Sequence, residues 1–190
     1  SNLVYAALFH PSYDAGALRA EAAEWERRHA APLRAFIRPH ENRPDPERRL
    51  KIGYVSPDFW RHVIRHFLTP LLEAHEHAGF EIYCYASVKR PDAVSARQRR
   101  SADVWRDVLG VGDEALAELI RGDGIDILVD LTQHMADHRL LAFARQPAPV
   151  QVSWVGYPGS TGLSAIGYRL TDAWLEPAGA PWSESVEEAV

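Results

Sequence analysis

Three polar segments each directly follow a short apolar run that is typical of a buried β-strand. They span residues 56–62, 132–138 and 156–162. In a parallel sheet, the segments that leave the carboxyl ends of the strands all emerge at one edge, where open α/β proteins bind ligands. The sequence therefore predicts that polar chemistry is gathered at one edge of a parallel sheet.

Strand-like and helix-like patterns alternate from residue 50 onward. Apolar runs predict strands at 52–55, 81–86, 104–108, 125–131 and 150–155. Helical spacing predicts helices at 63–78, 93–101 and 139–145, and a further helix that is capped by Asp113 and stopped by Gly122. Parallel neighbours need long right-handed crossovers, which these helices supply. We expect a Rossmann-like α/β fold, a parallel sheet flanked by helices, with strand order 3-2-1-4-5 and a crevice between the first and fourth strands.

The length and composition suit one globular domain with a short helical appendage. The chain has 190 residues, of which 46% are hydrophobic, so a second complete domain would not fit. Residues 1–37 carry apolar side chains at helical spacing and predict a helical segment, and residues 38–49, with three prolines among charges, predict an exposed linker. Residues 50–190 then form the α/β lobe.

Charge, cysteine content and hydropathy exclude several classes of protein. The net charge of −5 and the pI near 6.0 give no basic footprint for nucleic acid. Cys84, the single cysteine, lies in an apolar run and indicates a buried hydrophobic residue rather than a disulfide. No apolar run approaches the roughly 20 residues that span a bilayer. We expect a cytoplasmic protein with neither nucleic-acid nor membrane partners.

Several common catalytic and cofactor motifs are absent. No Gly-x-Gly-x-x-Gly follows the first strand, and no Walker loop, Cys-x-x-Cys or His-Glu-x-x-His occurs. A dinucleotide dehydrogenase, a P-loop enzyme and a zinc protease are therefore disfavoured. Two His-x-x-x-His pairs, His62 with His66 and His134 with His138, make zinc ligation an alternative, but such sites usually add a carboxylate or thiolate. We predict no metal.

The remaining polar residues at the strand ends each have a structural and a functional interpretation. Asp58 either caps the following helix or orients His62 by fixing its tautomer. His66 either packs under the sheet edge or faces a ligand. The glycines of 156–162 either make a tight turn or let backbone amides approach a sugar or phosphate, and their position beside the crevice favours the second interpretation.

Three stretches of the chain carry a family resemblance. Lys51–Phe59, Gly124–Leu131 and Arg145–Gly159 resemble the protein O-linked N-acetylglucosaminyltransferases, including their SPINDLY-like branch, in the same order and with similar spacing. The resemblance covers about residues 1–190. It implies the amino-terminal catalytic lobe of a two-lobed GT-B glycosyltransferase, truncated at its carboxyl end and preceded by the end of a tetratricopeptide (TPR) region. A nucleotide-binding lobe would follow residue 190.

The resemblance also implies a reaction. A sugar, GlcNAc from UDP-GlcNAc, passes with inversion to Ser or Thr of acceptor proteins that bind upstream repeats, and the nucleotide sugar is a substrate, so no cofactor is expected. Without the second lobe, this chain is expected to be inactive alone. Two alternatives stay open: an O-fucosyltransferase that uses GDP-fucose, and a non-catalytic interaction module linked to the repeats.

Individual residues take roles from the resemblance. It implies catalytic roles for Asp58, His62 and His10, the last near the junction with the repeats, and donor-sugar or acceptor contacts for His66, His134, Gly156 and Pro158. Two stretches depart from the family. Residues 63–65 read Val-Ile-Arg where human-type members have Pro-Thr-Ser, which removes a hydroxyl from the sugar pocket. Residues 133–135 read Gln-His-Met where the SPINDLY-like branch tends to have Gly-His-Thr, which implies a bulkier and less polar pocket wall.

Overall fold

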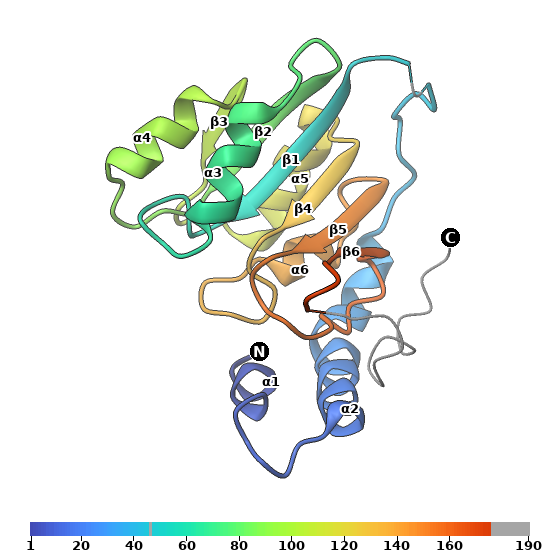
Figure 1. Cartoon of the computed structure of the whole chain (residues 1–190). Helices are drawn as coiled ribbons and strands as arrows, with labels where there is room; N and C mark the ends of the chain where they lie inside the picture. The colour runs from blue at the N-terminus through green and yellow to red at the C-terminus, as the bar shows by residue number, and fades with distance from the viewer. Residues whose placement is uncertain (46, 176–190) are drawn as a thin grey trace.

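A six-stranded sheet organises the protein, and all of its strand pairs are parallel. The computed structural model describes residues 1–45 and 47–175. The strands are β1 (Leu50–Ser56), β2 (Phe80–Ala86), β3 (Val104–Asp107), β4 (Ile127–Asp130), β5 (Val150–Trp154) and β6 (Tyr168–Leu170). Their order is β3-β2-β1-β4-β5-β6 (Figure 1). The predicted fold class and the order 3-2-1-4-5 are confirmed, and β6 is a further edge strand that sequence patterns missed.

Helices cover both faces of this sheet (Figure 1). On one face lie α3 (Arg65–Ala74) and α4 (Ala93–Arg100), and Leu68 and Leu72 of α3 pack in one apolar cluster with Ile82 of β2. On the other face lie α5 (Asp113–Asp123) and α6 (Leu140–Phe143), which share a second cluster with Leu128 of β4. In the part of the chain that the structure describes, no helix is long and apolar enough to cross a bilayer.

The predicted elements are right in type and differ at their ends. The helix predicted at 63–78 is α3, ten residues long, and the helix predicted at 139–145 is the four-residue α6. Gly122 does not stop α5. The helix continues to Asp123 and ends at Gly124, whose φ of +68° is the left-handed conformation that glycine adopts without steric cost. Asp113 is the first residue of α5 rather than its cap, and its carboxylate instead accepts a hydrogen bond from Arg139.

The helical segment at the amino terminus packs against the carboxyl edge of the sheet (Figure 1). It comprises α1 (Asn2–Ala7), α2 (Ala15–Trp25), the π-helical turn η1 (Glu26–Ala30) and the 3₁₀ turn η2 (Ala31–Phe36). Val4, Ala22 and Trp25 are buried in the same apolar cluster as α5 and α6. The division into a helical segment, a linker and a lobe stays a prediction, and the end of that lobe, residues 176–190, lies outside the described residues.

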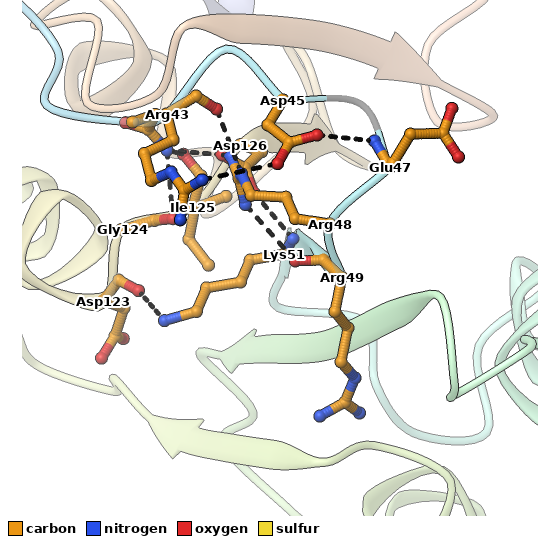
Figure 2. Close-up of polar contacts among 11 residues, drawn as sticks. Arg43, Asp45, Glu47, Arg48, Arg49, Lys51, Asp123, Gly124, Ile125 and Asp126 are labelled. Carbon is orange, nitrogen blue, oxygen red and sulfur yellow. Dashed lines mark hydrogen bonds and ion pairs between the residues drawn. The ribbon is translucent and has the colours of Figure 1, made fainter.

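The linker at 38–49 runs along the amino edge of the sheet, where the carboxylate of Asp126 is one of the groups that hold it (Figure 2). Asp126, directly before β4, pairs with the Arg48 guanidinium and accepts hydrogen bonds from Asn42 Nδ2 at 2.6 Å and from the Lys51 backbone N–H at 2.8 Å. A groove of about 860 Å³ lies between the linker and the end of α5. This groove is at the opposite edge of the sheet from the predicted site.

Candidate active site

The carboxyl ends of β1, β4 and β5 meet at one edge of the sheet. The strands are in register, with Val55 beside Asp130 and Asp130 beside Ser153. Just beyond them, the hydroxyl oxygens of Ser56 and Thr132 lie 3.5 Å apart. The three polar segments that follow these strands therefore leave the sheet together, beside the β1–β4 switch point where α/β proteins bind ligands.

The loop after β1, residues 57–64, is anchored at two apolar positions. Phe59 is completely buried, and its ring packs edge-on against Trp105 with the centroids 5.1 Å apart. Ile64 is also buried, just before α3 begins. Between these anchors the side chains of residues 60–63 are exposed or half-buried. The loop is thus held at both ends and presents Arg61 and His62 from its middle at the mouth of the site.

Asp58 and His62 lie next to each other in this loop. Asp58 Oδ2 is 3.8 Å from His62 Nδ1, and the Trp60 indole N–H donates to Asp58 Oδ1 at 3.3 Å. Burial raises the pKa of Asp58, and the nearby His62 opposes this rise. The His62 Nδ1 is buried and has no hydrogen-bond partner among the described residues. A small rotation of the ring would let Nδ1–H donate to Asp58, which would leave Nε2 free to face a ligand.

The structural alternatives for Asp58, as a helix cap, and for His66, as a residue packed under the sheet edge, are wrong. Because α3 begins at Arg65 and has no side-chain cap, Asp58 does not cap it. His62 precedes the helix, so His62 and His66 do not share a helical face, and His66 is exposed rather than tucked under the sheet edge. Among residues 1–45 and 47–175, no group of three or more His, Cys, Asp or Glu side chains is placed to hold a metal ion.

His134 is buried where the helical segment meets the sheet edge. Its Nε2 lies 2.8 Å from the Thr161 carbonyl oxygen and its Nδ1 lies 3.2 Å from Ser1 Oγ. The ring meets Trp25 and Tyr157 edge-on, at centroid distances of 4.9 and 5.7 Å. Burial lowers the pKa of His134 to about 4. A neutral ring that donates from Nε2 satisfies all of these contacts, and its predicted contact with donor or acceptor stays a prediction.

Two residues at the carboxyl end of β4, its last residue Asp130 and Gln133 in the loop that follows, have a role that sequence reasoning missed. Asp130 is buried, and its carboxylate accepts hydrogen bonds from the backbone N–H groups of Thr132 and Gln133 at 3.0 and 3.1 Å. The buried Gln133 side chain donates to the Trp154 carbonyl at 3.3 Å and accepts from the Tyr157 backbone N–H. Gln133 therefore joins the loop after β4 to the loop after β5, a function that only the spatial neighbourhood of the two loops reveals.

Packing explains the glycines at both ends of the third segment. A Cβ on Gly156 would lie 2.4 Å from the Leu131 carbonyl oxygen and 2.6 Å from Gln133 Oε1. Gly162 has a φ of +65°, and a Cβ there would lie 2.7 Å from the backbone of Ala22 in α2. Both positions need glycine because other parts of the chain come close. This reason suffices without a ligand, so the predicted donor contact of Gly156 stays a prediction.

The two remaining predicted site residues, Pro158 and His10, lie at the surface. Pro158 is exposed, and its carbonyl oxygen accepts a hydrogen bond from Arg169 Nη2 at 3.0 Å. His10 is exposed in the loop between α1 and α2, where Nδ1 accepts from the Ser12 backbone N–H at 3.3 Å and the ring meets Tyr13 edge-on. The structure thus brings Asp58 and His62 together and leaves His10 on the helical segment.

A hollow of about 280 Å³ opens at the carboxyl edge, between the loops after β2, β3 and β4. Its two cations are paired within the protein. Lys89 Nζ lies 2.6 Å from an Asp137 oxygen, and Arg139 Nε lies 2.6 Å from an Asp113 oxygen. Because each positive charge faces a carboxylate, this hollow offers no net charge that would attract a diphosphate.

His138 lies near His134, where the helical segment meets the sheet edge, and it makes the stability of the fold depend on pH. Its Nδ1 accepts a hydrogen bond from the Leu140 backbone N–H at 3.3 Å, and its ring lies edge-on to Trp25 at 6.0 Å. Burial lowers the pKa of His138 from 6.5 to about 4. Between pH 6.5 and about 4, His138 is therefore protonated in the unfolded chain but largely neutral in the folded protein. The free energy of unfolding consequently falls as the pH is lowered through this range.

Replacing His138 with asparagine is expected to make the fold less sensitive to acid. Asparagine keeps an acceptor for the Leu140 N–H and cannot take up a proton. In urea titrations, the free energy of unfolding should fall between pH 7.5 and pH 5 by up to about 2 kcal/mol more in the wild type than in His138→Asn. Burial raises the pKa of Asp130 to about 6, which acts in the opposite direction but equally in both proteins. The same pH dependence in both would contradict a half-buried, neutral His138.

Comparisons with known proteins agree with this architecture. The family model described as Glycosyl transferase family 41 matches residues 25–186. A Petunia hybrida protein described as a probable UDP-N-acetylglucosamine--peptide N-acetylglucosaminyltransferase SPINDLY is 41% identical over 154 residues, which cover 79% of this chain and 16% of the relative. An Arabidopsis thaliana protein described as a probable UDP-N-acetylglucosamine--peptide N-acetylglucosaminyltransferase SEC is 39% identical over 132 residues, which cover 68% of this chain and 13% of that relative.

A solved structure extends the similarity to three dimensions. A mutant of Thermobaculum terrenum O-GlcNAc transferase superposes with a TM-score of 0.84 at 45% sequence identity, over 90% of this chain and 33% of that one. The present chain thus spans a minor part of each of these proteins. A family model that covers most of the chain, and relatives that match it at about 40% identity, place it clearly: the chain belongs to glycosyl transferase family 41.

Proposed function

We propose that this chain is the amino-terminal catalytic lobe of a two-lobed GT-B enzyme that transfers GlcNAc from UDP-GlcNAc to Ser or Thr residues of acceptor proteins. The observation that carries the proposal is the 45% identity over 90% of the chain to an O-GlcNAc transferase of the same fold. The Asp58–His62 pair at the ligand-binding edge of the sheet supports it.

The proposed reaction is a single displacement with inversion. The acceptor hydroxyl oxygen forms a bond to the anomeric carbon of the sugar, the bond from that carbon to the diphosphate oxygen breaks, the nucleoside diphosphate leaves with the electron pair, and the hydroxyl proton passes to solvent. The nucleotide sugar is a substrate, and no cofactor is invoked. A lobe that follows residue 190 would bind the diphosphate and stabilise its developing charge, which is commonly the larger electrostatic contribution.

Within this scheme the described residues have defined tasks. His62 places donor and acceptor in reacting geometry rather than serving as a strong base, because a well-stabilised leaving group demands little proton abstraction. Asp58 would hold the ring of His62 once a small rotation brings Nδ1–H, now 3.8 Å from Asp58 Oδ2, within hydrogen-bonding distance. The catalytic role of His10 and the sugar or acceptor contacts of His66, His134, Gly156 and Pro158 are part of the proposal. TPR repeats upstream would deliver acceptor proteins, in the cytoplasm.

The test is transfer by the intact protein from which this chain comes. The purified protein is incubated with radiolabelled UDP-GlcNAc or GDP-fucose and with an extract of cells that lack the gene. We expect label from UDP-GlcNAc on Ser and Thr, and little from GDP-fucose. Transfer from GDP-fucose alone would show that the donor is GDP-fucose and that the protein is still a glycosyltransferase. If the protein binds proteins of the extract tightly but neither binds a nucleotide sugar nor transfers label, a non-catalytic interaction module is favoured.

A further inference from the structure

We propose that Asp92, a residue outside the predicted site, positions the loop that carries His62. The proposal rests on the proposed function of His62 and adds a residue to that site. Asp92 precedes α4, on a different segment from the loop after β1. One of its carboxylate oxygens, Oδ2, accepts a hydrogen bond at 2.9 Å from the backbone N–H of Arg61, the residue directly before His62.

The two oxygens of Asp92 have separate partners. Oδ1 accepts the backbone N–H groups of Val94 and Ser95 at 2.8 and 3.0 Å, and the Ser95 hydroxyl donates to the same oxygen and accepts from the Asp92 N–H. This capping box satisfies the start of α4 with Oδ1 alone. The contact between Oδ2 and Arg61 therefore adds nothing to the cap and instead joins α4 to the His62 loop.

The Arg61 amide lies in the part of the loop that has no other anchor. Phe59 and Ile64 fix the two ends of the loop in the apolar cluster. Between them, the described backbone hydrogen bonds of residues 60–63 stay within residues 58–66, apart from the bond from Arg61 to Asp92. A hydrogen bond from an amide to a carboxylate is stronger than one between neutral groups. Asp92 is thus placed to restrict the backbone that sets the position of the His62 ring.

Small movements of this backbone matter for the pair at the site. His62 Nδ1 lies 3.8 Å from Asp58 Oδ2, just beyond hydrogen-bonding distance, and forms no hydrogen bond within the described part of the chain. A group that positions substrates loses effectiveness when it is displaced by about 1 Å. Releasing the peptide next to His62 would therefore reduce the fraction of molecules in which Asp58 can hold the ring.

The test uses Asp92→Asn in the intact enzyme. Asparagine keeps one oxygen, Oδ1, for the cap. An NH2 group then stands in place of Oδ2, and it cannot accept the hydrogen bond from the Arg61 N–H. We expect the transfer rate from UDP-GlcNAc to fall about tenfold with little change in KM for the donor. Asp92→Ser, which caps helices well and is too short to reach Arg61, should give the same result. Amide hydrogen exchange at Arg61 should be faster in both variants.

Asp172 provides a matched control. Its Oδ1 accepts the backbone N–H groups of Trp174 and Leu175 at 2.8 and 2.9 Å, in the same local pattern as Asp92 with Val94 and Ser95. Asp172→Asn should keep the wild-type transfer rate. If Asp92 has a purely structural role, Asp92→Asn should have a lower melting temperature, and its transfer rate should fall only as far as the fraction of folded protein falls. That result would overturn the proposal.

A double-variant cycle separates this inference from the proposed function. If Asp92 acts through His62, adding Asp92→Asn to His62→Ala should slow transfer no further. If the rate losses of the two single variants multiply in the double variant, the proposal is overturned. A wild-type transfer rate in Asp92→Asn, or an unchanged rate of amide hydrogen exchange at Arg61 in that variant, would also overturn it. If His62→Ala is slow while Asp92→Asn is fast, only the role of Asp92 fails. If His62→Ala itself keeps the wild-type rate, the assignments of both residues fail.

Discussion

Replacing Gly156 with alanine is expected to lower the free energy of unfolding by about 3 kcal/mol, as severe overpacking does. The added methyl group would lie 2.4 Å from the Leu131 carbonyl oxygen and 2.6 Å from Gln133 Oε1. Neither neighbour is free to move, since Leu131 follows β4 directly and Gln133 is buried and bonded to the loop after β5. Urea denaturation at neutral pH measures the loss.

Gly167 is the matched control for this substitution. It lies in the same connection between β5 and β6, has no positive φ, and a Cβ there would meet nothing within 4 Å. Gly167→Ala should therefore change the stability by less than about 1 kcal/mol. If Gly156→Ala is equally mild but abolishes binding of a nucleotide sugar to the intact enzyme, the glycine serves ligand approach and the packing explanation is wrong.

Sequence patterns were sufficient for the sheet because its central strands are buried. β1, β2, β4 and β5 are short apolar runs separated by helices, and in a parallel sheet this alternation restricts the order to few solutions. β6 has no such signal, since Tyr168 and Leu170 are exposed and the strand has three residues. Pairing with β5, rather than burial, makes this segment a strand.

Element ends were less predictable, because they depend on single backbone conformations. Gly122 and Gly124 are both glycines near the end of α5, and nothing in the local pattern distinguishes them. The structure does so through the φ of +68° at Gly124, beside the Lys51 amine that donates to the Asp123 carbonyl at 2.7 Å. That bond comes from β1, so the choice between the two glycines is made by tertiary structure.

The site was predictable to the level of the sheet edge and the Asp58–His62 pair, and not beyond. A carboxylate and a histidine at the same strand end are visible in the sequence. The burial of His134 against Trp25, by contrast, arises because the helical segment folds back onto the sheet edge. Contacts between distant segments, such as this one and that of Asp92 with Arg61, leave no trace in local spacing.

Replacing His62 with alanine in the intact enzyme is expected to slow transfer from UDP-GlcNAc by about 100-fold or more, the usual scale for a positioned orienting or acid–base group. The melting temperature should change little, because the His62 side chain lies in a surface loop that Phe59 and Ile64 anchor without it. Single-turnover rates and thermal unfolding of the same preparations measure the two effects. The loss should fall mainly on kcat, since a group that acts in the transition state contributes little to ground-state binding of the donor.

His77 supplies the matched control, because it also pairs with an aspartate, Asp103, at 2.9 Å, but lies before β2 at the opposite edge of the sheet. His77→Ala should keep the wild-type transfer rate. If both variants transfer at the wild-type rate, the loop after β1 does not contain the working histidine. If His62→Ala instead unfolds several degrees earlier and slows transfer only in proportion to the folded fraction, His62 is a structural residue, and the placement of chemistry at this edge would then depend on Gly156 and its neighbours.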